Sequence, residues 1–335
     1  MNNVITSKNC LNIIRIIAAL EVAIGHITYH LNVHIPTFIG KIMHYFNGVP
    51  IFFMLSGFLI WQSIDRCKDF STYFRKRVLR IYPELWFCLF VEILSIVLFY
   101  QNWNIKDLIL FSFTQGTLLQ FWTPDSLRGY GCGTPNGSLW TITVIVQFYL
   151  LIWFARNFLK GKGIIRIGGV IAFSIILSMA QQLSFMQNHI LISKLYAQTV
   201  FNYLFLFLLG VVLAEYSDSI MRITKKYWYI FTIIGVFLYC INLDIPYTSY
   251  KVMFSLFSIY GLIGFAYACP MLNIKTDISY GFYIYHMVIV NVLISLGKRG
   301  EELYCIVALL SSLIIAYITT KTVGVFAKSF RSSKG

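Results

Sequence analysis

The sequence contains very little charge for its length. Only 12% of its 335 residues are charged, about half of the roughly 25% that is usual in soluble proteins. Hydrophobic residues make up 58% of the chain. This balance excludes a soluble globular fold, because too few polar side chains remain to cover the surface. It predicts an all-α fold, a polytopic integral membrane bundle of about ten transmembrane helices.

Ten apolar runs have the length of a membrane-spanning helix. They cover residues 11–30, 46–62, 81–100, 138–156, 164–181, 198–215, 227–243, 251–270, 280–296 and 303–323. Residues 107–122 form a weaker candidate. If this segment also crossed the membrane, the topology after it would be inverted, so the charges of the loops must decide.

Acidic residues are scarce, with 13 Asp and Glu against 27 Lys and Arg, and the net charge is +14. With ten spans and a cytoplasmic N-terminus, 19 of the basic residues fall in inner loops and 7 in outer loops. The positive-inside rule therefore predicts that both termini are cytoplasmic. The positive charge is explained by topology, so no nucleic-acid partner is expected.

The chain also lacks a CxxC pair, an internal repeat, a low-complexity stretch and a linker. Its seven cysteines are scattered and predict no disulfide framework. The first apolar run is interrupted by Arg15 and Glu21 and has no small-residue cleavage site after it, so it is interpreted as a retained span. We therefore expect a single domain over residues 1–335.

The first span carries ionisable residues that are costly inside a membrane. Arg15 and His26 are eleven positions apart, which places them within about 20° of one helix face and about 16 Å apart along the axis. Glu21 is about 140° away from His26 by the same geometry. Two interpretations stay open for this pair: a functional site, or a snorkelling arginine and a hydrogen-bonded bundle histidine.

Two further stretches allow both a structural and a functional interpretation. Ser56 and Gly57 lie in the middle of the second span, where small residues either allow close helix packing or leave backbone next to a ligand. Arg77 and Arg80 lie at the cytoplasmic start of the third span, just before Pro83. They are either a positive-inside flank or a pair that binds phosphates of a cytoplasmic ligand, such as coenzyme A.

Five motifs in order along the chain carry a resemblance to a known family. They are Arg15 with His26, FFMLSGFLI, the run from Arg77 to Pro83, GSLWTITVIVQFYLL from Gly137, and SYGFYIYHMVIV from Ser279. The chain resembles the membrane acyltransferase family 3, ten-helix enzymes that use acyl-CoA to O-acylate bacterial surface glycans. It is similar to the short members that O-acetylate sugars of lipopolysaccharide, capsule or related glycolipids. The resemblance implies a multi-pass protein of the bacterial cytoplasmic membrane.

The resemblance also implies roles for individual residues. It makes His26 the catalytic base, with Arg15 as a second catalytic residue on the acyl-CoA side. The matched motifs imply acyl-CoA binding by Arg77, Arg80, Ser56, Gly57 and Phe58, and substrate lining by Trp140, Tyr283 and His286. No bound cofactor or metal is implied: acetyl-CoA or another acyl-CoA is the donor substrate, a glycan or glycolipid is the acceptor, and lipid surrounds the protein.

One departure from the family pattern concerns the fourth motif. Members usually have a glutamate where this chain has Ile145. If that carboxylate orients the catalytic histidine, Glu21, Glu92 or another acid must replace it, or activity is weak or absent.

Two other hypotheses were weighed. His26, His30 and His34 are four residues apart, a spacing that suggests a metal site, but no cysteine or acid pair nearby completes a ligand set. A ten-helix protein with intramembrane charge is also compatible with a transporter or flippase of a glycan or lipid-linked intermediate. The hydropathy shows no pair of inverted halves, which favours the enzyme.

Overall fold

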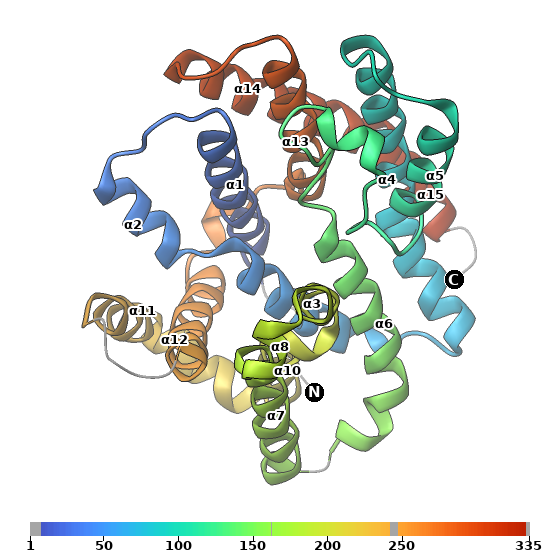
Figure 1. Cartoon of the computed structure of the whole chain (residues 1–335). Helices are drawn as coiled ribbons and strands as arrows, with labels where there is room; N and C mark the ends of the chain where they lie inside the picture. Colours follow the sequence, from blue (N-terminus) through green and yellow to red (C-terminus); the bar gives the residue numbers. More distant parts are fainter. Residues whose placement is uncertain (1–7, 162, 242–246, 333–335) are drawn as a thin grey trace. The chain divides into compact units, whose positions relative to one another are not determined.

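The structure is a computed structural model that describes residues 8–161, 163–241 and 247–332 (Figure 1). Within these ranges the chain forms helices and contains no strand. The α-helices are α1 Leu11–His30, α2 Thr37–Tyr45, α3 Gly48–Ile64, α4 Phe70–Phe99, α5 Ile105–Gln115, α6 Trp140–Leu159, α7 Gly163–Met179, α8 Ser184–Asn188, α9 Ile190–Ala197, α10 Leu204–Glu215, α11 Arg222–Ile241, α12 Tyr247–Ala268, α13 Ser279–Ser295, α14 Glu302–Thr319 and α15 Val325–Ser332.

The predicted fold class is confirmed, since the described chain is helical and several of its helices can span a membrane. In the part of the chain that the structure describes, six segments are long and apolar enough to do so, or seven if one bent pair is a single span. The predicted number of about ten is not confirmed. Helix α13 has 17 residues and α10 only 12, whereas a straight span needs about 20. Residues 242 and 243 of the predicted span 227–243, and both chain ends, lie outside the described residues.

Two segments show why the number of spans predicted from hydropathy differs from the number of helices long enough to cross a membrane. Helix α10 and the helical segment that follows it, Ser217–Cys240, are bent by 85° at a short break. This geometry is that of a broken span or a re-entrant segment. Helix α5, the only helix within the weaker candidate at 107–122 in the described chain, has 11 residues in all and ends at Gln115. At 1.5 Å per residue it is about 16 Å long, too short to cross the hydrocarbon core.

The described chain forms two compact units that alternate along the sequence. Unit 1 comprises residues 1–18, 42–70 and 147–276, and unit 2 comprises residues 19–41, 71–146 and 277–335. The single domain over residues 1–335 remains a prediction.

In unit 1, α3 and α10 pack through glycines. A Cβ atom on Gly57 would overlap the carbonyl oxygen of Phe207, and one on Gly210 would overlap the carbonyl oxygen of Met54. Beside this contact, the Phe148 ring lies 4.5 Å from that of Phe207 and stacks on it. Small residues are what allow two helix backbones to approach so closely in a membrane protein.

In unit 2, α13 is the central helix, with most of its residues buried. It contacts α4, since Cys88 Sγ lies 3.4 Å from the carbonyl oxygen of Ile284 and Tyr280 donates a hydrogen bond to the carbonyl of Ile81. Helix α4 continues through Pro83. Helix α13 also carries buried polar residues, among them His286 and Asn291.

Candidate active site

Arg15 and His26 both lie in the continuous helix α1, as the first apolar run predicts. Their separation of eleven positions corresponds to about 16 Å along the axis. By contacts, Arg15 belongs to unit 1 and His26 to unit 2. The contacts of His26 described here therefore lie within unit 2.

His26 pairs with a second imidazole, His286 of α13. Nδ1 of His26 lies 2.9 Å from Nε2 of His286, and the two ring centroids are 5.2 Å apart with an interplanar angle of 28°. His286 is fully buried, whereas His26 is partly exposed. Among the described residues, neither ring is hydrogen-bonded to a carboxylate, and Nε2 of His26 has no protein partner. The pair therefore leaves one nitrogen of His26 available to a substrate.

Tyr283 holds α13 against the segment that leads into α6. Its hydroxyl donates a hydrogen bond of 2.9 Å to the carbonyl of Ser138 and lies 2.9 Å from Oγ1 of Thr141. The Tyr283 ring lies 6.0 Å from the His286 ring, edge to face. The motifs around Gly137 and Ser279 thus meet beside the histidine pair. Trp140 begins α6 at this same contact.

A polar cavity of about 730 Å³ adjoins the histidine pair. Its connection to the pair is His30, whose ring centroid is 6.1 Å from that of His26. The lining residues come from three separate segments of unit 2: Tyr29, His30, Asn32, Gly131, Cys132, Arg299 and Gly300. A ligand in this cavity would therefore lie close to His26 and its hydrogen-bonded partner His286.

Direct hydrogen bonds join the walls of this cavity. Asn291, fully buried in α13, accepts a hydrogen bond from the backbone N–H of Cys132 and donates to the carbonyls of Thr134 and Pro135. The N–H of Gly300 donates to the carbonyl of Leu31, 2.8 Å away. Because each wall is fixed to another, the cavity is preformed.

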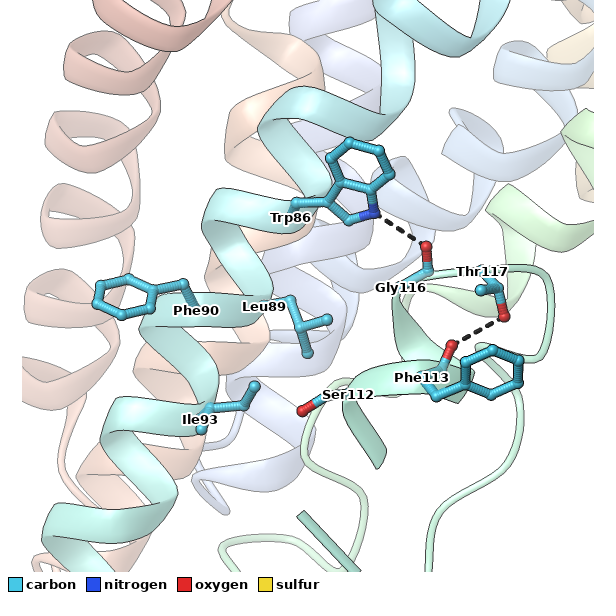
Figure 2. Close-up of a pocket in the computed structure, with 8 residues that line it drawn as sticks. All are labelled: Trp86, Leu89, Phe90, Ile93, Ser112, Phe113, Gly116 and Thr117. Carbon is cyan, nitrogen blue, oxygen red and sulfur yellow. Dashed lines mark hydrogen bonds between the residues drawn. The ribbon is translucent and has the colours of Figure 1, made fainter. Parts of the chain in front are cut away.

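A second cavity, of about 410 Å³, lies between α4 and α5 and is apolar (Figure 2). Its polar atoms are used within the protein: Trp86 Nε1 donates to the carbonyl of Gly116, and Thr117 Oγ1 donates to that of Phe113. Its lining contains no titratable side chain, and the hydroxyls of Ser112 and Thr117 donate to backbone carbonyls. It offers no chemistry for acyl transfer.

The predicted acyl-CoA residues lie on two helices. Arg77 and Arg80 lie on the N-terminal part of α4, with the Arg77 guanidinium 5.2 Å from the centre of the Tyr73 ring. Ser56, Gly57 and Phe58 lie in α3, where Phe58 is fully buried and Gly57 contacts α10. The structure thus gives Gly57 a packing role, and acyl-CoA binding by these residues stays a prediction.

Among the described residues, neither Glu21 nor Glu92 is hydrogen-bonded to a ring of the histidine pair. Glu92 is 1% exposed, and neither of its carboxyl oxygens has a hydrogen-bond partner among the described residues. An unpaired buried carboxylate is costly, so we expect Glu92 to be held as the neutral acid. Ile145 lies in α6. The hydrogen-bond partner of His26 in the described chain is the imidazole of His286, not a carboxylate.

The three-histidine ladder is not formed. His34 lies beyond the end of α1 and is exposed. In the described ranges no group of three or more His, Cys, Asp or Glu side chains is arranged to hold a metal ion.

Sequence reasoning missed the pairing of His26 with His286 and the roles of Asn291 and Arg299. The two histidines are 260 residues apart, and no spacing rule connects them. The one signal for Asn291 was its position in an otherwise apolar span, since polar residues there usually face the protein interior.

Comparison with known proteins agrees with the motifs. A family model described as an acyltransferase domain matches residues 8–321. The chain is 27% identical to Nodulation protein 10 of Rhizobium leguminosarum bv. viciae, an alignment that covers 97% of this chain and 95% of that protein. It is 28% identical to the O-acetyl transferase of Shigella phage Sf6, with 88% of each chain covered. No solved structure matches.

The family match spans nearly the whole chain and includes both histidines of the pair. The helical fold supplies several membrane spans. The chain therefore belongs to the membrane acyltransferase family 3, and it is a multi-pass membrane acyltransferase.

Proposed function

We propose that this protein is an O-acyltransferase of the bacterial cytoplasmic membrane that moves an acyl group, such as acetyl, from cytoplasmic acyl-CoA to a sugar hydroxyl of a surface polysaccharide or glycolipid. The observation that supports this most is the pair of His26 and His286 beside a polar cavity. The name of the phage relative, an O-acetyl transferase, supports the same reaction class.

The hydrogen bond between the two imidazoles suggests how a base is prepared. A neutral imidazole has one N–H and one lone pair. If His26 donates Nδ1–H to Nε2 of His286, the lone pair of His26 is at Nε2, the nitrogen without a protein partner. His286 then acts as a positioning residue that fixes this tautomer, the role that a carboxylate has in many catalytic triads.

In the proposed reaction, the acyl group passes from the thioester sulfur to the sugar oxygen. Nε2 of His26 takes the proton of the sugar hydroxyl as the hydroxyl oxygen bonds to the thioester carbonyl carbon. The C–S bond breaks, the coenzyme A thiolate leaves, and it receives the proton from the His26 imidazolium. Thioester and alcohol become ester and thiol. As His26 becomes positive, its hydrogen bond to the neutral His286 becomes charge-assisted and therefore stronger.

We assign the phosphates of the donor to Arg77 and Arg80 of α4, and the family resemblance implies that Arg15 also acts on the acyl-CoA side. Forked guanidinium groups match phosphate oxygens, and coenzyme A carries several phosphates. The positive-inside rule places Arg77 and Arg80 on the cytoplasmic side, where acyl-CoA is made available to the enzyme. Ser56, Gly57 and Phe58 are included in the proposal because the family resemblance implies that they bind acyl-CoA.

A two-part experiment tests the proposal. Purified full-length protein should release coenzyme A from labelled acetyl-CoA, or exchange the acyl group, which a transporter or flippase would not do. Cells that carry the gene should show an O-acetyl ester on their surface glycan that disappears on deletion. Absence of both activities from folded protein would refute the proposal.

A further inference from the structure

The polar cavity next to the histidine pair has a positive lining. Arg299 is the only one of its seven lining residues that always carries a charge, and none of the seven is an acid. Arg299 is exposed, and it has no ion-pair partner among the described residues. A guanidinium that faces a cavity without a carboxylate is available to a ligand.

The charge of Arg299 acts on Cys132, which also lines the cavity. Burial raises the pKa of the Cys132 thiol, and the Arg299 guanidinium acts in the opposite direction by favouring the thiolate. The neighbouring Lys298 does not line the cavity, since its ammonium lies over the ring of Tyr304 at 5.7 Å. Glu301 and Glu302 follow in the chain, and both are exposed and outside the lining.

The remaining lining residues suit a sugar ring. Tyr29 is 81% exposed at the rim, and an exposed aromatic ring offers an apolar face with a polar tip. His30 and Asn32 supply hydrogen-bonding groups. Gly300 has a positive φ angle of 83°, and nothing lies within 4 Å of its Cβ position, so it leaves backbone accessible to a ligand. Gly131, with φ 59°, instead allows the loop to pack against Asn291.

We propose that this cavity binds the acceptor sugar and that Arg299 selects sugars that carry a carboxylate or a phosphate group. The proposal rests on the proposed function, since it assigns the acceptor side of that reaction. Guanidinium groups bind both anions through paired, charge-assisted hydrogen bonds. The anionic group would hold the sugar while a hydroxyl of the same ring approaches His26.

Cys132 provides a reporter inside the cavity. In the purified full-length protein, its modification by a negatively charged and by a positively charged methanethiosulfonate reagent can be followed by mass spectrometry of its peptide. With both rates normalised to a free thiol, the anionic reagent should be favoured by roughly three- to tenfold, from the Coulomb energy of one nearby charge in a water-like medium. Added salt should reduce this preference.

Two variants in one loop isolate the charge. Arg299→Gln should remove the preference for the anionic reagent, and Lys298→Gln, the matched control, should keep it. Arg299→Lys should also keep it, because the charge is retained. Equal behaviour of Arg299→Gln and Lys298→Gln would overturn the assignment.

Protection of Cys132 then tests sugar selection. Glucuronate or glucose 1-phosphate should protect the thiol at a concentration at least about tenfold below that needed for glucose, the effect of one charge-assisted hydrogen bond. Protection by glucuronate alone would assign an acidic sugar, and by glucose 1-phosphate alone a phosphorylated one. Arg299→Gln should abolish the difference. Equal protection by the three sugars, or protection by none, would contradict the proposal.

These results are separable from the proposed function. Release of coenzyme A from acetyl-CoA by the wild-type protein reports on the proposed function, whereas protection of Cys132 by sugars reports on the acceptor site. If that release occurs but the anionic sugars have no advantage, the acceptor assignment fails and the transferase stands. If the wild type neither releases nor exchanges the acyl group, the proposed function itself fails.

Discussion

Nδ1 of His26 and Nε2 of His286 are 2.9 Å apart, although 260 residues separate them in the chain. The contact joins α1 to α13 and buries the His286 ring completely. Its chemical consequence is that His26 has a fixed partner on one ring nitrogen and an available lone pair or proton on the other.

His286 should act as a positioning residue. His286→Leu removes the acceptor for His26 Nδ1–H. We expect kcat to fall by roughly ten- to a hundredfold, because a hydrogen bond to a group that becomes charged is lost. The KM for acyl-CoA should change little. His286→Asn keeps an acceptor oxygen and should retain more activity. Activity needs neutral His26, so it should rise with pH through the imidazole titration, and the midpoint of this rise should move in both variants.

A purely structural role for His286 predicts something else. It would lower the amount of folded protein without moving the pH midpoint, and Asn would be no better than Leu. Kinetics over a pH series at equal folded concentration separate the two roles.

At the donor end, Arg77→Lys and Arg80→Lys should weaken acyl-CoA binding by roughly ten- to a hundredfold, because Lys keeps the charge but loses the forked geometry. Arg75 is a control on the same helix, since it is exposed and donates to the carbonyl of Phe330. Arg75→Lys should leave the affinity unchanged. Unchanged affinity in all three variants would leave Arg77 and Arg80 as topological flanks.

The glycine contacts between α3 and α10 should be sensitive to a single methyl group. Gly57→Ala and Gly210→Ala place a Cβ against backbone atoms, which cannot move as a side chain can, so each should destabilise the protein by about 1–3 kcal/mol. Gly168→Ala in α7 is the control, because nothing lies within 4 Å of its Cβ position. Thermal unfolding in detergent measures all three. Equal melting temperatures would refute the close packing.

Two native cysteines report on topology. The loop over residues 62–80 should be cytoplasmic and that over 101–137 external, so a membrane-impermeant maleimide should label Cys132 but not Cys67 in intact spheroplasts. Both thiols are partly accessible, and permeabilised cells supply the control in which both react. Labelling of Cys67 from outside would invert the assignment that loop charges favour.

Local sequence patterns predicted the helices well. The run at 11–30 is helix α1 with the same boundaries, and 280–296 differs from α13 by one residue at each end. An apolar segment in a membrane must form a helix, because only a helix satisfies all the backbone hydrogen bonds of a single segment. Hydropathy therefore predicts such helices from the local sequence. It did not reveal the short α10 and its bend, since a bent pair of helices has the same composition as a straight one.

The site was predictable only in part. His26 and His286 were each singled out, but their contact depends on how distant helices pack. Asn291 had only its position in an apolar span as a signal, and Arg299 had none, because the cavity forms where segments distant in the chain are held together by hydrogen bonds. Gly57 shows the converse, since a motif read as a ligand site also has a packing explanation.

The most direct test of the central claim is acyl transfer by the His26→Ala protein. Loss of a general base should reduce transfer from acetyl-CoA to the acceptor by roughly 10²- to 10⁴-fold, while expression and melting temperature stay close to those of the wild type. His34→Ala, which alters an exposed histidine outside α1, should transfer normally. Transfer by His26→Ala at the wild-type rate and equal folded concentration would contradict the account.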